Sequence, residues 1–152
     1  MFRKLIIRWK TARGKAVDIW SKSPYPADVL SNLHGNGFRF DGMVCGSMEG
    51  FLQSLKCKDC DKQRQICRMK GRNAKNMSSS DWQTDRIVWW RGKAIDRQSE
   101  EFIELVGRTC RAMFEQNKSF RAALMSTRGM TLYHTKGEHN PFKTIPTEKV
   151  PS

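Results

Sequence analysis

Three polar residues in the segment 47–56, which reads SMEGFLQSLK, have side chains that could do chemistry. If Ser47 caps a helix there, Glu49, Gln53 and Lys56 lie at i, i+4 and i+7 and share one face. A carboxylate, an amide and an ammonium group would then line one surface. A glutamate in the first turn is also favoured by the helix dipole alone. The spacing by itself favours that plainer interpretation, so a chemical role for Glu49 needs further support.

Cysteine and histidine residues are the next candidates for chemistry. The chain has five cysteines, an odd number, and no export signal, so reduced thiols are expected rather than disulfides. Cys57-x2-Cys60 has the spacing of half a zinc site, but Cys45, Cys67 and the histidines form no second close pair. The sequence also contains no P-loop, GxSxG or HExxH motif. It therefore favours ordinary cysteines over zinc, and predicts no metal and no cofactor.

The net charge of +13 is concentrated in two segments. Residues 1–15 hold six basic and no acidic residues, and residues 56–75 hold eight basic residues against Asp59 and Asp61. Clustered positive charge suggests an anionic partner such as DNA or RNA. The alternative is a set of solvated faces that keep the protein soluble. No apolar run approaches the ~20 residues of a membrane span, so we expect a cytoplasmic protein without a membrane partner.

The basic N-terminal segment allows two structural interpretations. It lacks acidic residues, as a transit peptide does, but it is not enriched in serine. Leu5, Ile7 and Trp9 alternate with other residues, and this period of two is typical of a strand with one buried face. The strand is favoured. We therefore treat residues 1–17 as a basic extension or edge strand that precedes a domain over residues 18–152.

Turn and capping signals predict the elements that would position the segment 47–56. Asp41-Gly42 between two apolar triplets predicts a hairpin, and Ser47 and Ser99 are suited to capping helices. The mixture predicts an α+β fold, in which helices pack on a small β-sheet in a compact single domain. The expected elements are a hairpin over 38–45, a helix after Ser47, a basic helix over 62–70 that ends at Gly71, a strand or buried loop over 87–90, a long helix after Ser99, a short helix over 119–125 and a strand over 131–134.

A series of short motifs runs through the chain in a fixed order. They are Leu30-Ser31-Asn32-Leu33, Phe38-x-Phe40-Asp41-Gly42, Ser47-x-Glu49-x3-Gln53-x2-Lys56, Trp90-x-Gly92-x2-Ile95-Asp96-Arg97-x-Ser99, Phe114-x-Gln116-Asn117-x2-Phe120 and Leu132-x-His134-x2-Gly137. Their order and approximate spacing resemble the NADAR/YbiA-like superfamily over about residues 18–145. The segment SMEGFLQSLK is most similar to the compact branch of that superfamily, found in bacterial and phage-like proteins. This resemblance implies the cytoplasm of a bacterial cell or of a phage-infected host.

The resemblance implies a compact, YbiA-like α+β fold and an N-glycosidase activity. Family members hydrolyse the bond between ribose and a nitrogen base, in ribosylamino-pyrimidine riboflavin intermediates or in ADP-ribose attached to guanine in nucleic acid. The family's helix glutamate falls on Glu49. Breaking an N-ribosyl bond develops oxocarbenium character on the sugar. A nearby carboxylate stabilises that charge and can position or deprotonate the attacking water.

Other residues would bind the substrate under this interpretation. Gln53 and Lys56 share the face of Glu49 and would bind sugar hydroxyls or phosphate. Asn32 would help to fix the ribose, or it is a turn residue that bonds its own backbone. Trp90 would stack on a base, as aromatic side chains do in single-strand binders, or it belongs to the core.

Two departures from the family pattern leave the function open. The family often has an acidic residue where this chain has Asn140, and an amide can hold a sugar hydroxyl but cannot act as a carboxylate. Single-domain relatives have a functional tryptophan where this chain has Gln98. One expectation is therefore an N-glycosidase. The alternatives are a non-catalytic protein that binds ADP-ribose, a nucleotide or a nucleic acid in the same pocket, and a basic interaction protein whose pocket is idle.

Overall fold

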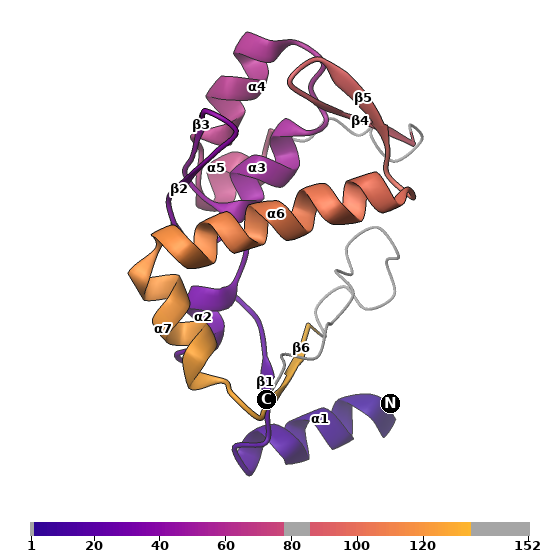
Figure 1. The fold of residues 1–152 in the computed structure, drawn as a ribbon. Coiled ribbons are helices and arrows are strands. Elements are labelled where there is room, and N and C mark those ends of the chain that lie inside the picture. Colours follow the sequence, from indigo (N-terminus) through magenta and orange to yellow (C-terminus); the bar gives the residue numbers. More distant parts are fainter. Residues whose placement is uncertain (1, 78–85, 135–152) are drawn as a thin grey trace. The chain divides into compact units, whose positions relative to one another are not determined.

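The computed structural model describes residues 2–77 and 86–134 and has a mixed α+β fold (Figure 1), as predicted. The chain forms two compact units. The middle unit is Asn32–Lys118, and the terminal unit combines Met1–Ser31 with Ser119–Ser152. In the described residues the strands form three two-stranded pairs. The boundary expected between residues 17 and 18 stays a prediction.

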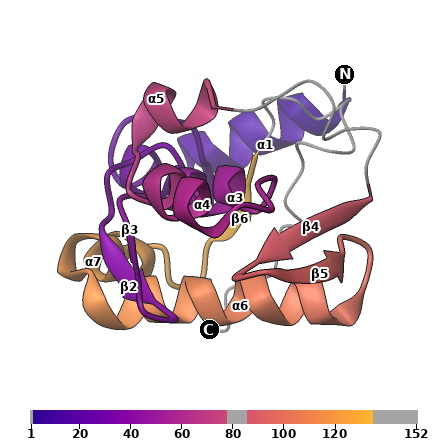
Figure 2. The ribbon, with the colours of Figure 1, turned by 90° about the horizontal axis from the view of Figure 1, so that it is seen from above.

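The middle unit contains the segment around Glu49. Two antiparallel hairpins, β2–β3 and β4–β5, lie along the long helix α6, as Figure 2 shows. Helix α3 packs on α4 and α5. The elements in chain order are β2 (Phe38–Phe40), β3 (Met43–Cys45), α3 (Met48–Ser54), α4 (Cys60–Cys67), α5 (Gly71–Lys75), β4 (Ile87–Trp90), β5 (Lys93–Asp96) and α6 (Glu100–Gln116).

The local signals of the sequence account for several of these elements. Both hairpins turn through residue pairs with positive φ: 47° and 76° at Asp41-Gly42, and 49° and 84° at Arg91-Gly92. Such pairs suit the tight turns that match the twist of the strands. Ser47 Oγ accepts a hydrogen bond from Gly50 N at 3.0 Å, and Ser99 Oγ accepts one from Phe102 N at 3.3 Å. The predicted hairpin over 38–45 and both helix starts are therefore confirmed, and residues 87–90 form a strand.

The basic helix expected over 62–70 has different limits. Helix α4 begins at Cys60, because Asp59 caps it by accepting a hydrogen bond from Lys62 N at 2.7 Å. The helix ends at Cys67, before the expected limit. Gly71, expected to follow a helix end, instead begins α5 with a φ of 60°.

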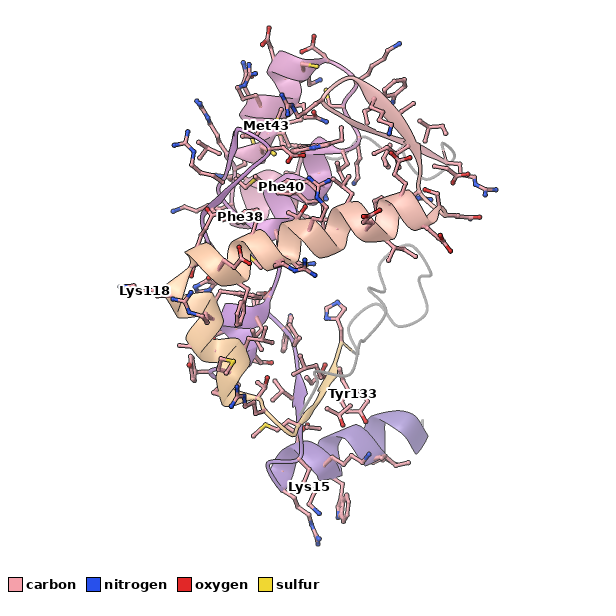
Figure 3. The ribbon with its side chains drawn as sticks, in the orientation of Figure 1. Lys15, Phe38, Phe40, Met43, Lys118 and Tyr133 are labelled. Carbon is pink, nitrogen blue, oxygen red and sulfur yellow. The ribbon has the colours of Figure 1, made fainter. Side chains whose placement is uncertain are left out.

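The core of the middle unit joins its two hairpins to α3. The rings of Phe40, Phe51 and Trp90 contact one another, with centroids 5.1–6.0 Å apart. Figure 3 shows Phe38, Phe40 and Met43 on the first hairpin, where all three are buried. Gln63 of α4 is also buried. Its Nε2 donates to the carbonyl oxygens of Ser54, Cys57 and Trp89, and its Oε1 accepts from Arg91 N at 2.9 Å. One glutamine thus connects three elements by satisfying their backbone groups.

The terminal unit is built on a parallel strand pair. Strand β1 pairs with β6, with Ala16 opposite Thr131, and Thr131 N donates to Lys15 O at 3.1 Å. Lys15 and Tyr133 mark this pair in Figure 3. No helix among the described residues is long and apolar enough to cross a membrane. The elements of the unit are α1 (Phe2–Ala12), β1 (Ala16–Asp18), α2 (Ala27–Leu30), α7 (Lys118–Ser126) and β6 (Thr131–Tyr133).

The strand predicted around Leu5, Ile7 and Trp9 is wrong, because this segment forms helix α1. Leu5 and Trp9 stand at i and i+4, so the same residues also match one face of a helix. A period of two over five residues is too short to separate the two structures. The guanidinium of Arg13 lies 4.3 Å from the ring centroid of Trp9, one turn further on.

Candidate functional site

The N-terminus of α3 is fixed by close backbone contacts. A Cβ atom on Gly50 would lie 2.7 Å from Cys67 O and closer still to Met69 O, so only glycine fits against the end of α4. Ser47 Oγ donates to Met69 O at 3.0 Å while it caps α3. Gly46 N donates to Cys67 O at 2.8 Å. These contacts fix the first turn of α3 and therefore the position of the Glu49 side chain.

The structure brings Glu49, Gln53 and Lys56 together as a hydrogen-bonded row. Gln53 Nε2 donates to Glu49 Oε1 at 2.8 Å, and Lys56 Nζ donates to Gln53 Oε1 at 2.6 Å. Gln53 is buried, whereas Glu49 and Lys56 are half-buried. We call this row the α3 array. It holds a carboxylate in a defined orientation beside an ammonium group.

The charged form of Lys56 is destabilised in this position. Its partial burial lowers its pKa to about 8; the carboxylate of Glu49 opposes this shift, and Arg97 adds to it. Arg97, just after β5, therefore acts on the end of the α3 array. Two cations near one carboxylate suit the binding of an anionic ligand such as a phosphate. Arg97 belongs to the same motif as Trp90 and Ser99, but its spacing in the sequence did not single it out, because its proximity to Lys56 is set by the second hairpin.

The backbone of Asn32 contacts the α3 array. Its carbonyl oxygen accepts a hydrogen bond from Glu49 N at 2.9 Å, so the Leu-Ser-Asn segment helps to hold the start of α3. The side chain of Asn32 is half-buried. Its contact with a ribose stays a prediction.

Trp90 lies in the core of the middle unit. Its ring stacks on Phe40, its indole N–H donates to Asp41 Oδ2 at 2.9 Å, and it is 6% exposed. This position agrees with the core alternative stated for it, and its stacking on a base stays a prediction. Asn140 lies outside the described residues.

A hollow of about 220 Å³ is lined in part by Trp90. Lys93 and Glu101, which form an ion pair, and Glu104 and Arg108 line it. Arg108 also pairs with Asp41 at 3.0 Å. None of the residues that line this hollow belongs to the α3 array.

The cysteines fall into different environments. Cys45 and Cys67 are buried with their sulfur atoms 3.8 Å apart, and their contact and burial raise the pKa of Cys45. Cys57 and Cys60 are more exposed. Within residues 2–77 and 86–134, no three histidine, cysteine or acidic side chains are grouped so that they could hold a metal ion.

Comparisons with known proteins agree with this architecture. The solved NMR structure of the E. coli protein YbiA superposes with a TM-score of 0.54 at 20% identity, over 78% of this chain and 66% of YbiA. The chain thus spans just under two thirds of the length of YbiA, and its fold is YbiA-like, as the sequence resemblance implied.

The sequence comparisons define the family more narrowly. The bacteriophage protein GP30.3 family matches residues 24–150, and the chain belongs to this family. A 17.1 kDa protein in the Gp30-rIII intergenic region of Enterobacteria phage T4 is 36% identical over 124 residues. That match covers 78% of this chain and 80% of the T4 protein.

Proposed function

We propose that the chain is an N-glycosidase that hydrolyses the bond between ribose, or ADP-ribose, and a nitrogen base, with Glu49 as its catalytic residue. The observation that carries this proposal is the α3 array, in which Gln53 orients the carboxylate of Glu49. The YbiA-like fold and the motifs that resemble the NADAR superfamily support it. Glu49 lies where the superfamily's helix glutamate would be.

The proposed reaction needs one carboxylate and one water. The bond from ribose C1 to the base nitrogen breaks, water supplies the oxygen that replaces the base, and the water's proton is passed on to the departing base. Glu49 stabilises the positive charge on the sugar and accepts the proton from water. Lys56 and Arg97 bind a phosphate attached to the ribose. Asn32, Trp90 and Asn140 remain proposed substrate contacts.

A second candidate function is non-catalytic binding of ADP-ribose or a nucleotide at the α3 array. Asn140 favours it, because an amide stands where the superfamily often has an acid. The half-buried cation Lys56 beside Arg97 would bind such an anion without any chemistry. Binding without release of a base is the result that distinguishes this candidate from the N-glycosidase.

The test is an activity screen over ribosylamino-pyrimidines, NAD and ADP-ribosylated guanine, with release of the base followed by liquid chromatography. Glu49→Gln preserves an acceptor for Gln53 and removes the charge, so the fold should be retained. The matched control is Glu104→Gln, an exposed glutamate on α6. We expect release of the base by the wild type and by the control, and release at least about a hundredfold slower by Glu49→Gln. Binding of a substrate without release by the wild type would instead support the second candidate.

A further inference from the structure

The turn between α4 and α5 has a high density of positive charge. Between Lys62 and Lys75 the chain has six basic residues and no acidic residue. Arg68, Lys70 and Arg72 follow one another at every second position and are all exposed. Among the described residues, no carboxylate forms an ion pair with any of these three. We call residues 68–72 the basic junction.

The backbone of the basic junction is held against the loop and the helix end that position Glu49. A Cβ on Gly46 would lie 2.8 Å from the carbonyl carbon of Arg68, and Met69 O accepts from Ser47 Oγ. The side chain of Lys70 passes over Gly35, where a Cβ would be 3.0 Å from Lys70 Cδ. The basic junction is therefore next to the start of α3 in space as well as basic in sequence.

Three cations within five residues repel one another, and no carboxylate of the residues that the structure describes pairs with them to offset this. An extended polyanion would relieve the repulsion, because successive backbone phosphates of a nucleic acid follow at a regular spacing and each can accept one cation. A single small anion carries one such group, whereas a strand presents one phosphate after another. Charge complementarity therefore points to a phosphodiester strand as the ligand.

We propose that the basic junction is a nucleic-acid binding surface, on which Arg68, Lys70 and Arg72 contact backbone phosphates without reading the base sequence. This binding does not depend on the proposed N-glycosidase. If that function holds as well, the surface would bring a base carried on a strand to Glu49, since the basic junction lies against Gly46, Ser47 and Gly50, which surround Glu49 in sequence.

The test measures binding of a fluorescein-labelled 20-nucleotide single-stranded DNA, the matching RNA and the DNA duplex by fluorescence anisotropy. The variant Arg68→Gln/Lys70→Gln/Arg72→Gln changes only exposed side chains. The control Arg39→Gln/Arg111→Gln/Lys118→Gln removes the same charge from exposed positions on β2, α6 and the start of α7. Circular dichroism checks that both variants are folded.

We expect the basic-junction variant to lose at least about tenfold in affinity near 0.1 M salt, and the control to stay within about twofold. The dependence of log K on log[salt] should become shallower by about two in the variant, at roughly 0.7–0.9 per phosphate contact. Equal losses in the two variants would overturn the proposal. So would binding to phosphatidylglycerol vesicles without binding to any oligonucleotide. If the basic-junction variant binds nucleic acid no worse than the control while base release still depends on Glu49, only the nucleic-acid proposal is refuted and the proposed N-glycosidase function is retained.

Discussion

At the scale of single residues, the position of Glu49 depends on groups from three segments. Asn32 O accepts from its backbone N–H, Gln53 holds its carboxylate, and Gly50 beside it permits the approach of α4. The sequence could predict that Glu49, Gln53 and Lys56 share a face, since this follows from helical spacing. It could not predict Arg97, which is forty-one positions from Lys56 and is brought near by packing.

The charge of Lys56 makes a prediction about pH. Because the pKa of Lys56 is lowered to about 8, its ammonium group is present below that pH and lost above it. Affinity for ADP-ribose should therefore fall by roughly fivefold, or about 1 kcal/mol, between pH 7 and pH 9. Isothermal titration calorimetry at pH 7 and pH 9 measures this affinity. The Lys56→Arg variant stays charged over this range, so its affinity for ADP-ribose should not change with pH. If the affinity of the wild type is equally independent of pH, Lys56 has no role in binding the anion.

At the scale of elements, the caps and tight turns are the features that the sequence predicted well. Ser47, Ser99 and Asp41-Gly42 act locally, so their neighbours in sequence determine what they do. Helix α1 was not predicted, because residues 5–9 match the period of two of a strand as well as the i, i+4 spacing of a helix. Strand β5 was not predicted at all, because Lys93–Asp96 forms a strand through its pairing with β4 and has little pattern of its own.

The junction of α3 and α4 predicts contrasting effects of alanine at two helical glycines. Gly50→Ala forces a methyl group into the carbonyl groups of Cys67 and Met69 and should cost roughly 1–3 kcal/mol of unfolding free energy. Gly107 lies within α6 with open space at its Cβ, so Gly107→Ala should stabilise by up to about 1 kcal/mol. Urea denaturation measures both. A neutral Gly50→Ala would mean that this contact does not fix the start of α3.

At the scale of the whole molecule, the α+β class followed from the mixture of elements, but the division into units did not. The terminal unit joins the two ends of the sequence through the pairing of β1 with β6, and a pairing between residues more than a hundred positions apart leaves no local signal. The two basic clusters, in contrast, could be identified from the sequence alone. Apart from the half-buried Lys56, the basic residues of the second cluster are exposed, on or beside α4 and α5.

The two units should differ in local stability. In the middle unit, Phe51 of α3 and Gln63 of α4 are buried, whereas β1 and β6 form a sheet of only two strands in which β6 is half-buried. Hydrogen exchange measured by mass spectrometry should show slower exchange in α3 and α4 than in the β1–β6 pair. Equal protection would show that the strand pair is as stable as the core of the middle unit.

The central claim is that the carboxylate of Glu49 performs the chemistry. The most direct test compares the rate of base release by Glu49→Gln and by the wild type on the substrate identified in the screen, with affinity for that substrate measured in parallel. The account predicts a loss of release of at least about a hundredfold while binding is retained, which is the range of a positioned acid–base group. Release at the wild-type rate by folded Glu49→Gln would contradict it.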